Sequence, residues 1–86
     1  MKKVKMFVMT GCPHCLLADG YLRYLRTKDK YKDIEIEKIN ESKEPELADQ
    51  YDYYYVPTFY VGDEKVHEGH AEKADVQKVL DLALED

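Results

Sequence analysis

The segment Cys12-Pro13-His14-Cys15 constrains this chain more than any other feature, because it joins two kinds of local structure. Before it, residues 4–9 form a short, mostly apolar run rich in β-forming residues, which predicts a strand covered on both faces. After it, apolar residues recur at helical spacing to about Thr27, and Pro13 stands at the first helical position, where proline is favoured. The sequence therefore predicts a strand, a break at Thr10-Gly11 and a helix that begins at the cysteines.

The rest of the chain alternates between strand and helix patterns. The helix after the cysteines is expected to pack through Leu17, Tyr21, Tyr24 and Leu25, and the charged run 28–33 is expected to be a solvated connection. Strands are predicted over 34–39, 56–61 and 65–68, with Gly62-Asp63 as the turn between the last two. A short helix is expected near Pro45, with Leu47, Ala48 and Tyr51 on one face, and a final helix should end near Leu84.

This order, β-α-β-α-β-β-α, defines the fold class as α/β. Strands joined through a helix are parallel with a right-handed crossover, and the last two strands form an antiparallel hairpin. The prediction is a three-layer α/β/α sandwich around a mixed four-stranded sheet. At ~150 residues per domain, residues 1–86 form a single domain.

Charge and hydropathy exclude several classes of protein. With 13 basic and 18 acidic residues the net charge is −5, the wrong sign for a nucleic-acid-binding protein. We find neither the apolar run of a signal peptide nor that of a membrane span, so we expect a cytoplasmic protein without a membrane partner, and a monomer. Two cysteines are too few for a disulfide scaffold, and in a reducing compartment a close pair points to catalysis or metal binding.

The spacing gives the two cysteines different roles. Cys12 lies beside the unpaired N–H groups and the positive dipole end of the helix, where a thiolate is stabilised. Cys12 is therefore the predicted nucleophile, and Cys15, one turn later, is the predicted resolving thiol. A partly protonated His14 would stabilise the thiolate further, which predicts a couple more oxidising than that of thioredoxin.

Metal binding is the alternative use of these cysteines. Cys12, Cys15, His67 and His70 are the residue types of a zinc site, but the histidines have two intervening residues rather than three to five. We therefore expect no metal there, with His67 exposed on a strand and His70 next to a helix cap. An iron–sulfur cluster held between two chains by the same cysteines is a second non-enzymatic hypothesis.

The motifs resemble a known family. Cys12-Pro13-His14-Cys15 after a strand, the helical segment Glu46-Leu47-Ala48, Val56-Pro57-Thr58 and the hairpin glycine Gly62 are similar, in that order, to the thioredoxin superfamily and its compact glutaredoxin-like branch. The resemblance covers nearly the whole chain. It implies a thiol-disulfide oxidoreductase without a bound cofactor, acting on protein or small-molecule disulfides and reduced by glutathione or by a thioredoxin reductase.

The resemblance also implies a substrate groove. The proline corresponding to Pro57 is cis and faces the active-site sulfur, and Val56 before it offers its backbone to an extended substrate. Gly69 retains one glycine of the glutaredoxin pair, whereas Met9 stands where glutaredoxins commonly have lysine. Tyr55 belongs to a run of tyrosines leading into Pro57, which forms either an apolar wall of this groove or ordinary packing and exposed loop.

Overall fold

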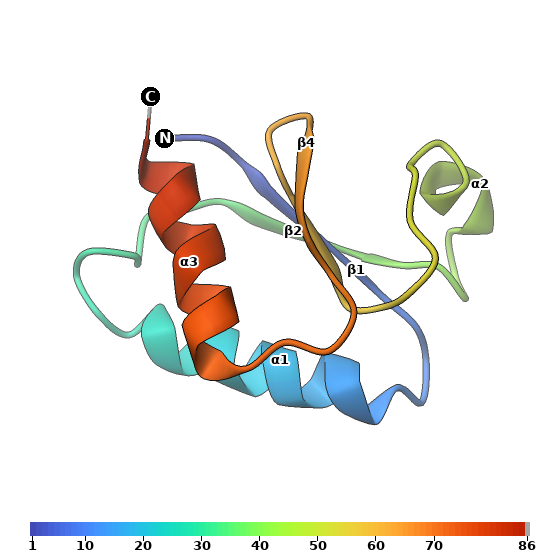
Figure 1. Cartoon of the computed structure of the whole chain (residues 1–86), viewed down its shortest axis with the longest axis horizontal. Coiled ribbons are helices and arrows are strands. Elements are labelled where there is room, and N and C mark those ends of the chain that lie inside the picture. The colour runs from blue at the N-terminus through green and yellow to red at the C-terminus, as the bar shows by residue number, and fades with distance from the viewer. Residues whose placement is uncertain (86) are drawn as a thin grey trace.

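The computed structural model describes residues 1–85 and has the predicted order of elements (Figure 1). The bounds are β1 Val4–Val8, α1 Pro13–Leu25, β2 Ile36–Asn40, α2 Pro45–Ala48, β3 Thr58–Val61, β4 Glu64–Glu68 and α3 Lys73–Leu84. Each predicted helix and strand is present, and the strand bounds differ from the predicted ones by one or two residues.

The four strands form one mixed sheet in the order β2-β1-β3-β4. β1 runs parallel to β2 and antiparallel to β3, and β3 runs antiparallel to β4. Val8 at the end of β1 pairs with Asn40 at the end of β2, and Thr58 at the start of β3 pairs with Glu68 at the end of β4. The segments around the cysteines, Pro57 and Gly69 therefore lie close together, at the same end of the strands.

Helices cover both faces, which gives the predicted three layers. The alternation of β1 separates them: Val4, Met6 and Val8 pack with α1 and α3, whereas Phe7 packs with α2. In Figure 1, α1 lies below the strands and α3 stands at the left with its lower end against α1, whereas α2 lies apart at the right, beyond the strands. Within residues 1–85 no helix has the length and apolarity needed to cross a membrane.

The inward face of α1 agrees with the predicted one only at Leu25 and, in part, at Tyr21. Its buried residues are Cys15, Ala18, Leu22 and Leu25, whereas Leu17 and Tyr24 are exposed and Tyr21 is half-buried. Both sets have helical spacing, so periodicity alone could not choose between them. Ala18, Leu22 and Leu25 pack in the core with residues of β1 and α3, and Tyr24 instead stacks beside the ammonium groups of Lys28 and Lys73.

The connection 28–33 is also not simply solvated, because Tyr31 within it is only 1% exposed. The Tyr31 hydroxyl donates a 2.6 Å hydrogen bond to Asp81 of α3, which satisfies its polar end. The aromatic ring thus holds a charged loop against the core. This burial could not be predicted from the sequence, because the residues around Tyr31 are mostly lysines and aspartates.

The face of the sheet that α2 covers holds an aromatic cluster, made of Phe7, Tyr51, Tyr53 and Tyr60. The ring centroid of Phe7 lies 4.8 Å from those of Tyr51 and Tyr53 and 5.6 Å from that of Tyr60. Burial, together with a hydrogen bond to Glu41, raises the pKa of the Tyr53 phenol. The cluster fixes the chain that leads from α2 toward Pro57.

Candidate functional site

The cysteine pair lies where the sequence predicted it, between β1 and α1. The chain turns at Gly11, whose φ of +75° is a conformation that favours glycine, and Pro13 is the first residue of α1. Cys12 and Cys15 are joined by a disulfide with their Cα atoms 5.2 Å apart. Both are buried against the core, at 6% and 5% exposure. Exposure therefore does not distinguish the two sulfurs.

Backbone geometry does distinguish them. Cys12 is the N-cap of α1, and its sulfur accepts a 3.1 Å hydrogen bond from the backbone N–H of Cys15. A sulfur that receives an N–H group at the positive end of a helix dipole is stabilised most when it carries negative charge. The arrangement thus favours a thiolate on Cys12 once the disulfide opens.

Pro57 lies on the adjacent chain segment, immediately before β3. The Val56–Pro57 peptide bond is cis, which confirms the expectation drawn from the family resemblance. Since Phe7 of β1 pairs with Thr58 of β3, Pro57 lies at the same end of the strands as the cysteines. The carbonyl of Pro57 accepts a 2.9 Å hydrogen bond from Gly69, whose φ is +93°. Two of the predicted groove residues, Pro57 and Gly69, are therefore in direct contact.

Glu68 at the end of β4 holds the loop that enters this cis bond. One carboxylate oxygen accepts hydrogen bonds from the backbone N–H groups of both Tyr54 and Tyr55, and the other pairs with Lys65 at 2.8 Å. The ammonium group of Lys65, followed by the two N–H groups, lowers the pKa of Glu68 to about 2. Sequence reasoning missed this contact, since an acidic residue on an edge strand carries no signal of its partner.

Replacing Glu68 with glutamine is expected to weaken the acid dependence of stability. The pKa of Glu68 is lowered from 4.5 to about 2, so this stabilisation is complete above about pH 4.5 and lost as the pH falls toward 2. Urea denaturation at about pH 5 and about pH 2.5 should show a larger loss of unfolding free energy in the wild type than in Glu68→Gln. Glu64→Gln, on the same strand, should follow the wild type. Parallel losses in the wild type and Glu68→Gln would contradict this role.

His14, between the cysteines, meets a second histidine. Its Nδ1 lies 2.9 Å from Nδ1 of His70, and the other ring nitrogen of His70 contacts the carboxylate of Glu72, the N-cap of α3. His67 is half-buried rather than exposed, and its Nε2 donates to the carbonyl of His70 at 2.9 Å. One Nδ1 of the pair donates this hydrogen bond and the other accepts it. The sequence predicted the capping neighbour, but not this contact between α1 and the segment before α3.

The tyrosine run divides into two pairs. Tyr51 and Tyr53 belong to the aromatic cluster, whereas Tyr54 and Tyr55 are 86% and 70% exposed. The exposed rings follow one another directly before Val56. Of the run, only this second pair is therefore exposed beside the cis-proline loop.

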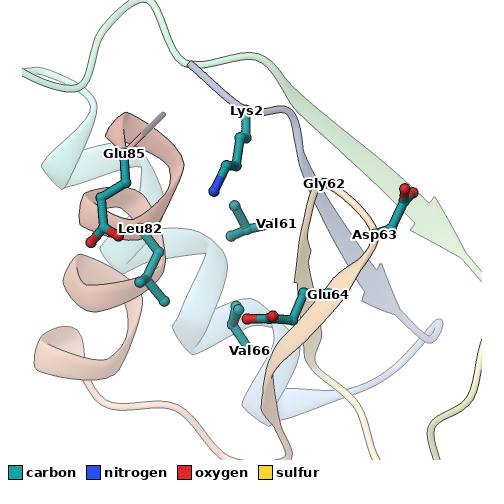
Figure 2. A pocket seen from close by; sticks show the side chains of 8 residues that line it. All are labelled: Lys2, Val61, Gly62, Asp63, Glu64, Val66, Leu82 and Glu85. Atoms are coloured by element: carbon teal, nitrogen blue, oxygen red, sulfur yellow. The ribbon is translucent and has the colours of Figure 1, made fainter.

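A hollow of about 320 Å³, here called the cysteine cavity, opens beside the disulfide. Its lining includes Cys12, Cys15, Met9, Leu16, Lys38 and Lys43. A larger hollow of about 600 Å³ lies between the β3–β4 hairpin and the end of α3, lined by residues such as Val61, Val66 and Leu82 (Figure 2). That hollow is at the opposite end of the strands from the cysteines, because the Gly62 N–H donates a hydrogen bond to the carbonyl of Lys3, just before the start of β1. The cysteine cavity is the smaller of the two hollows, but it is the one that lies beside the disulfide.

Metal ligation was the alternative for these residues. In residues 1–85 no three His, Cys, Asp or Glu side chains are placed to hold a metal ion. The cysteines are bonded to each other, and the histidines of the candidate zinc set contact His14, the carbonyl of His70 and Glu72.

Comparison with known proteins identifies the family. A family model described as a thioredoxin domain matches residues 2–81. The chain belongs to the thioredoxin domain family. Among solved thioredoxin-like structures, one from Clostridium perfringens is 26% identical, with a TM-score of 0.73 over 98% of this chain and 71% of that one. No curated protein matched.

Two further structures share the thioredoxin fold at lower identity. A malarial protein is 18% identical, with a TM-score of 0.71, covering 95% of this chain and 96% of that one. A mutant of another thioredoxin-like protein is 21% identical, with a TM-score of 0.64, covering 91% and 99%. The chain is thus a redox-type thioredoxin-fold protein with a Cys-X-X-Cys disulfide at the start of its first helix.

Proposed function

We propose that this protein is a thiol-disulfide oxidoreductase that reduces or exchanges disulfides through Cys12 and Cys15. The observation that carries the proposal is the disulfide at the N-terminus of α1, in which the Cys12 sulfur accepts the N–H of Cys15. A Cys-X-X-Cys pair at this position of a thioredoxin domain fits two-electron transfer by thiol-disulfide exchange.

The reduced protein would act in two steps. The Cys12 thiolate attacks one sulfur of a substrate disulfide, which forms a mixed disulfide and releases the other substrate sulfur as a thiolate. The thiolate of Cys15 then attacks the Cys12 sulfur, which releases the second substrate thiolate and closes the Cys12–Cys15 bond. The substrate gains two electrons and, from solvent, two protons, and the protein is oxidised by two electrons.

The cis-proline loop is the proposed docking element for the substrate chain. Within residues 1–85 the backbone N–H and carbonyl of Val56 take part in none of the protein's own hydrogen bonds. They are thus available to an extended peptide, as in strand addition to a sheet edge. Tyr55 and Tyr54 beside them offer apolar ring faces with polar hydroxyls.

Turnover tests this proposal. The protein, with either glutathione or NADPH and a thioredoxin reductase as electron donor, is expected to accelerate the reduction of a model protein disulfide. If the protein accelerates the reduction with neither of the two donors, the proposal is contradicted. Stoichiometric zinc or iron in anaerobically purified protein, detected by metal analysis and by the ultraviolet-visible spectrum, would also contradict it. We further propose that the protein acts as a monomer in the cytoplasm, without a cofactor and without nucleic-acid or membrane partners.

His14 provides a second, narrower test. A positive imidazole ring on the first turn of α1 favours the Cys12 thiolate, and so stabilises the reduced form and makes the couple more oxidising. His14→Gly is therefore expected to shift the equilibrium potential of the pair to a more negative value. An equilibrium redox titration of both proteins measures the shift, and an unchanged potential would contradict the role of His14.

A further inference from the structure

We infer that Glu72 and His70 keep His14 protonated beside the reduced cysteine pair, and that they thereby set its redox potential. The inference rests on the proposed function, because it concerns the equilibrium between the Cys12–Cys15 disulfide and its dithiol. It goes beyond the role given to His14 alone, since it adds two positioning residues from the segment that leads into α3.

Three side chains form a continuous line from the first turn of α1 to the N-cap of α3. Nδ1 of His14 lies 2.9 Å from Nδ1 of His70, and the two ring centroids are 5.0 Å apart at an interplanar angle of 85°. The opposite ring nitrogen of His70, Nε2, contacts a carboxylate oxygen of Glu72. The backbone is held as well, because Nε2 of His67 donates to the carbonyl of His70. The His70 ring is therefore fixed through both of its nitrogens.

The Glu72 carboxylate determines which nitrogen of His70 carries the hydrogen. An ionised carboxylate only accepts hydrogen bonds, so Nε2 of His70 is the donor in this contact. A neutral His70 ring then has its lone pair on Nδ1, which accepts a hydrogen bond from Nδ1–H of His14. A protonated His14 carries a hydrogen on both ring nitrogens. Glu72 thus orients His70 as an acceptor for the charged form of His14.

The charges along the line favour a proton on His14. A carboxylate that accepts from one nitrogen of an imidazole makes the other nitrogen more basic. Nδ1 of His70 therefore holds the Nδ1–H of a positively charged His14 more strongly than that of a neutral one. A positive ring on the first turn of α1 stabilises the Cys12 thiolate, and a more stable reduced form makes the couple more oxidising.

The other charged groups near the start of α3 have partners of their own. The carboxylate of Asp75 accepts the backbone N–H of Glu72 at 2.9 Å. The ammonium group of Lys73 lies 4.9 Å from the ring centroid of Tyr24. At the end of β4, Glu68 binds the backbone of the cis-proline loop. On the first turn of α1, the other titratable groups are the two cysteines themselves. Glu72 is therefore the acid through which the histidine pair is held.

The sign of the effect distinguishes this arrangement from simple repulsion. A carboxylate that acts only through space repels the Cys12 thiolate, so removing the charge of Glu72 would stabilise the thiolate and make the potential less negative. A carboxylate that acts through the two histidines has the opposite effect, because its removal lowers the positive charge beside Cys12. The direction of the shift therefore decides between the two.

Equilibrium redox titration in glutathione buffers at pH 7 measures this shift. Glu72→Gln is expected to move the equilibrium about threefold toward the disulfide, which corresponds to a potential about 14 mV more negative. The shift is modest because the Glu72 side chain is 63% exposed and solvent screens its charge. His70→Leu should shift the potential in the same direction, because it removes the acceptor. At about pH 9, where imidazole rings are neutral, the negative shift of Glu72→Gln should disappear.

Two variants serve as controls. Asp75→Asn removes an equal charge from the same turn of α3 and keeps an acceptor for the N–H of Glu72, so its potential should not become more negative. The double variant His14→Gly/Glu72→Gln should have the potential of His14→Gly alone, because Glu72 then has no charged ring to act through.

The outcomes separate this inference from the proposed function. A potential of Glu72→Gln equal to that of the wild type, or less negative, would overturn the inference and leave the oxidoreductase in place. So would a negative shift that persists in the His14→Gly background. Wild-type cysteines that never pass between disulfide and dithiol would overturn the proposed function as well. A negative shift that requires both His14 and neutral pH supports Glu72 and His70 as positioning residues.

Discussion

Replacing Cys12 with serine is expected to reduce disulfide exchange to the rate of the buffer alone. Serine has the size of cysteine, but its hydroxyl does not ionise near neutral pH and forms no disulfide. The stabilisation that the N–H of Cys15 and the helix dipole offer at this position then has no thiolate to act on. No mixed disulfide with the substrate should form, and turnover should disappear with every electron donor.

Cys15→Ser is the matched variant, because it removes a thiol of nearly equal burial one turn along the same helix. It keeps the nucleophile and removes the group that releases the substrate. The mixed disulfide on Cys12 should accumulate, and mass spectrometry after acid quenching should detect the protein plus one half of the substrate. Trapping by Cys12→Ser instead, or by both variants equally, would contradict the roles assigned to the two sulfurs.

Phe7→Ala is expected to have the largest effect on stability. Phe7 is fully buried and touches three other rings of the aromatic cluster, so its removal loses the transfer free energy of the ring and leaves a cavity. The expected cost is about 3–5 kcal/mol, against a total of roughly 4–13 kcal/mol for a domain of this length. Urea denaturation should show the loss, and activity should fall with it because the cluster holds the chain that enters the cis-proline loop.

Tyr54→Ala is the control for this prediction. Tyr54 belongs to the same tyrosine run but is 86% exposed, so its truncation should change the free energy of unfolding by less than about 0.5 kcal/mol. Equal destabilisation by the two variants would show that the run acts as one unit rather than as a packed pair and an exposed pair.

Local patterns predicted the architecture well, because strands, helices and turns here follow residue spacing. Pro13 and Gly11 mark the start of α1, and the hairpin turn lies at Gly62 as expected. The inward face predicted for α1 was wrong at Leu17 and Tyr24, since two sets of residues share the helical spacing and only packing in the folded protein decides between them. Burial of Tyr31 was missed for a similar reason, because its partner Asp81 lies fifty residues away.

The site shows the same division between local and long-range information. The unequal positions of Cys12 and Cys15 follow from spacing, since both lie on one turn of a helix. The contacts of Glu68 with the Tyr54–Tyr55 backbone and of His14 with His70 join segments that only the folded sheet brings together. One sequence carries no signal for such pairs, whereas the cis Val56–Pro57 bond was predicted because the family resemblance supplied it.

Equilibrium redox titration of the wild-type protein tests the central claim most directly. The purified protein is equilibrated anaerobically in glutathione buffers of increasing oxidation, its thiols are alkylated, and its intact mass is measured. We predict one reversible two-electron transition between a Cys12–Cys15 disulfide and a doubly alkylated dithiol. Its midpoint should lie on the oxidising side of the thioredoxin value of about −270 mV. Cysteines that stay reduced, or stay blocked by a bound metal, across the whole series would contradict the account.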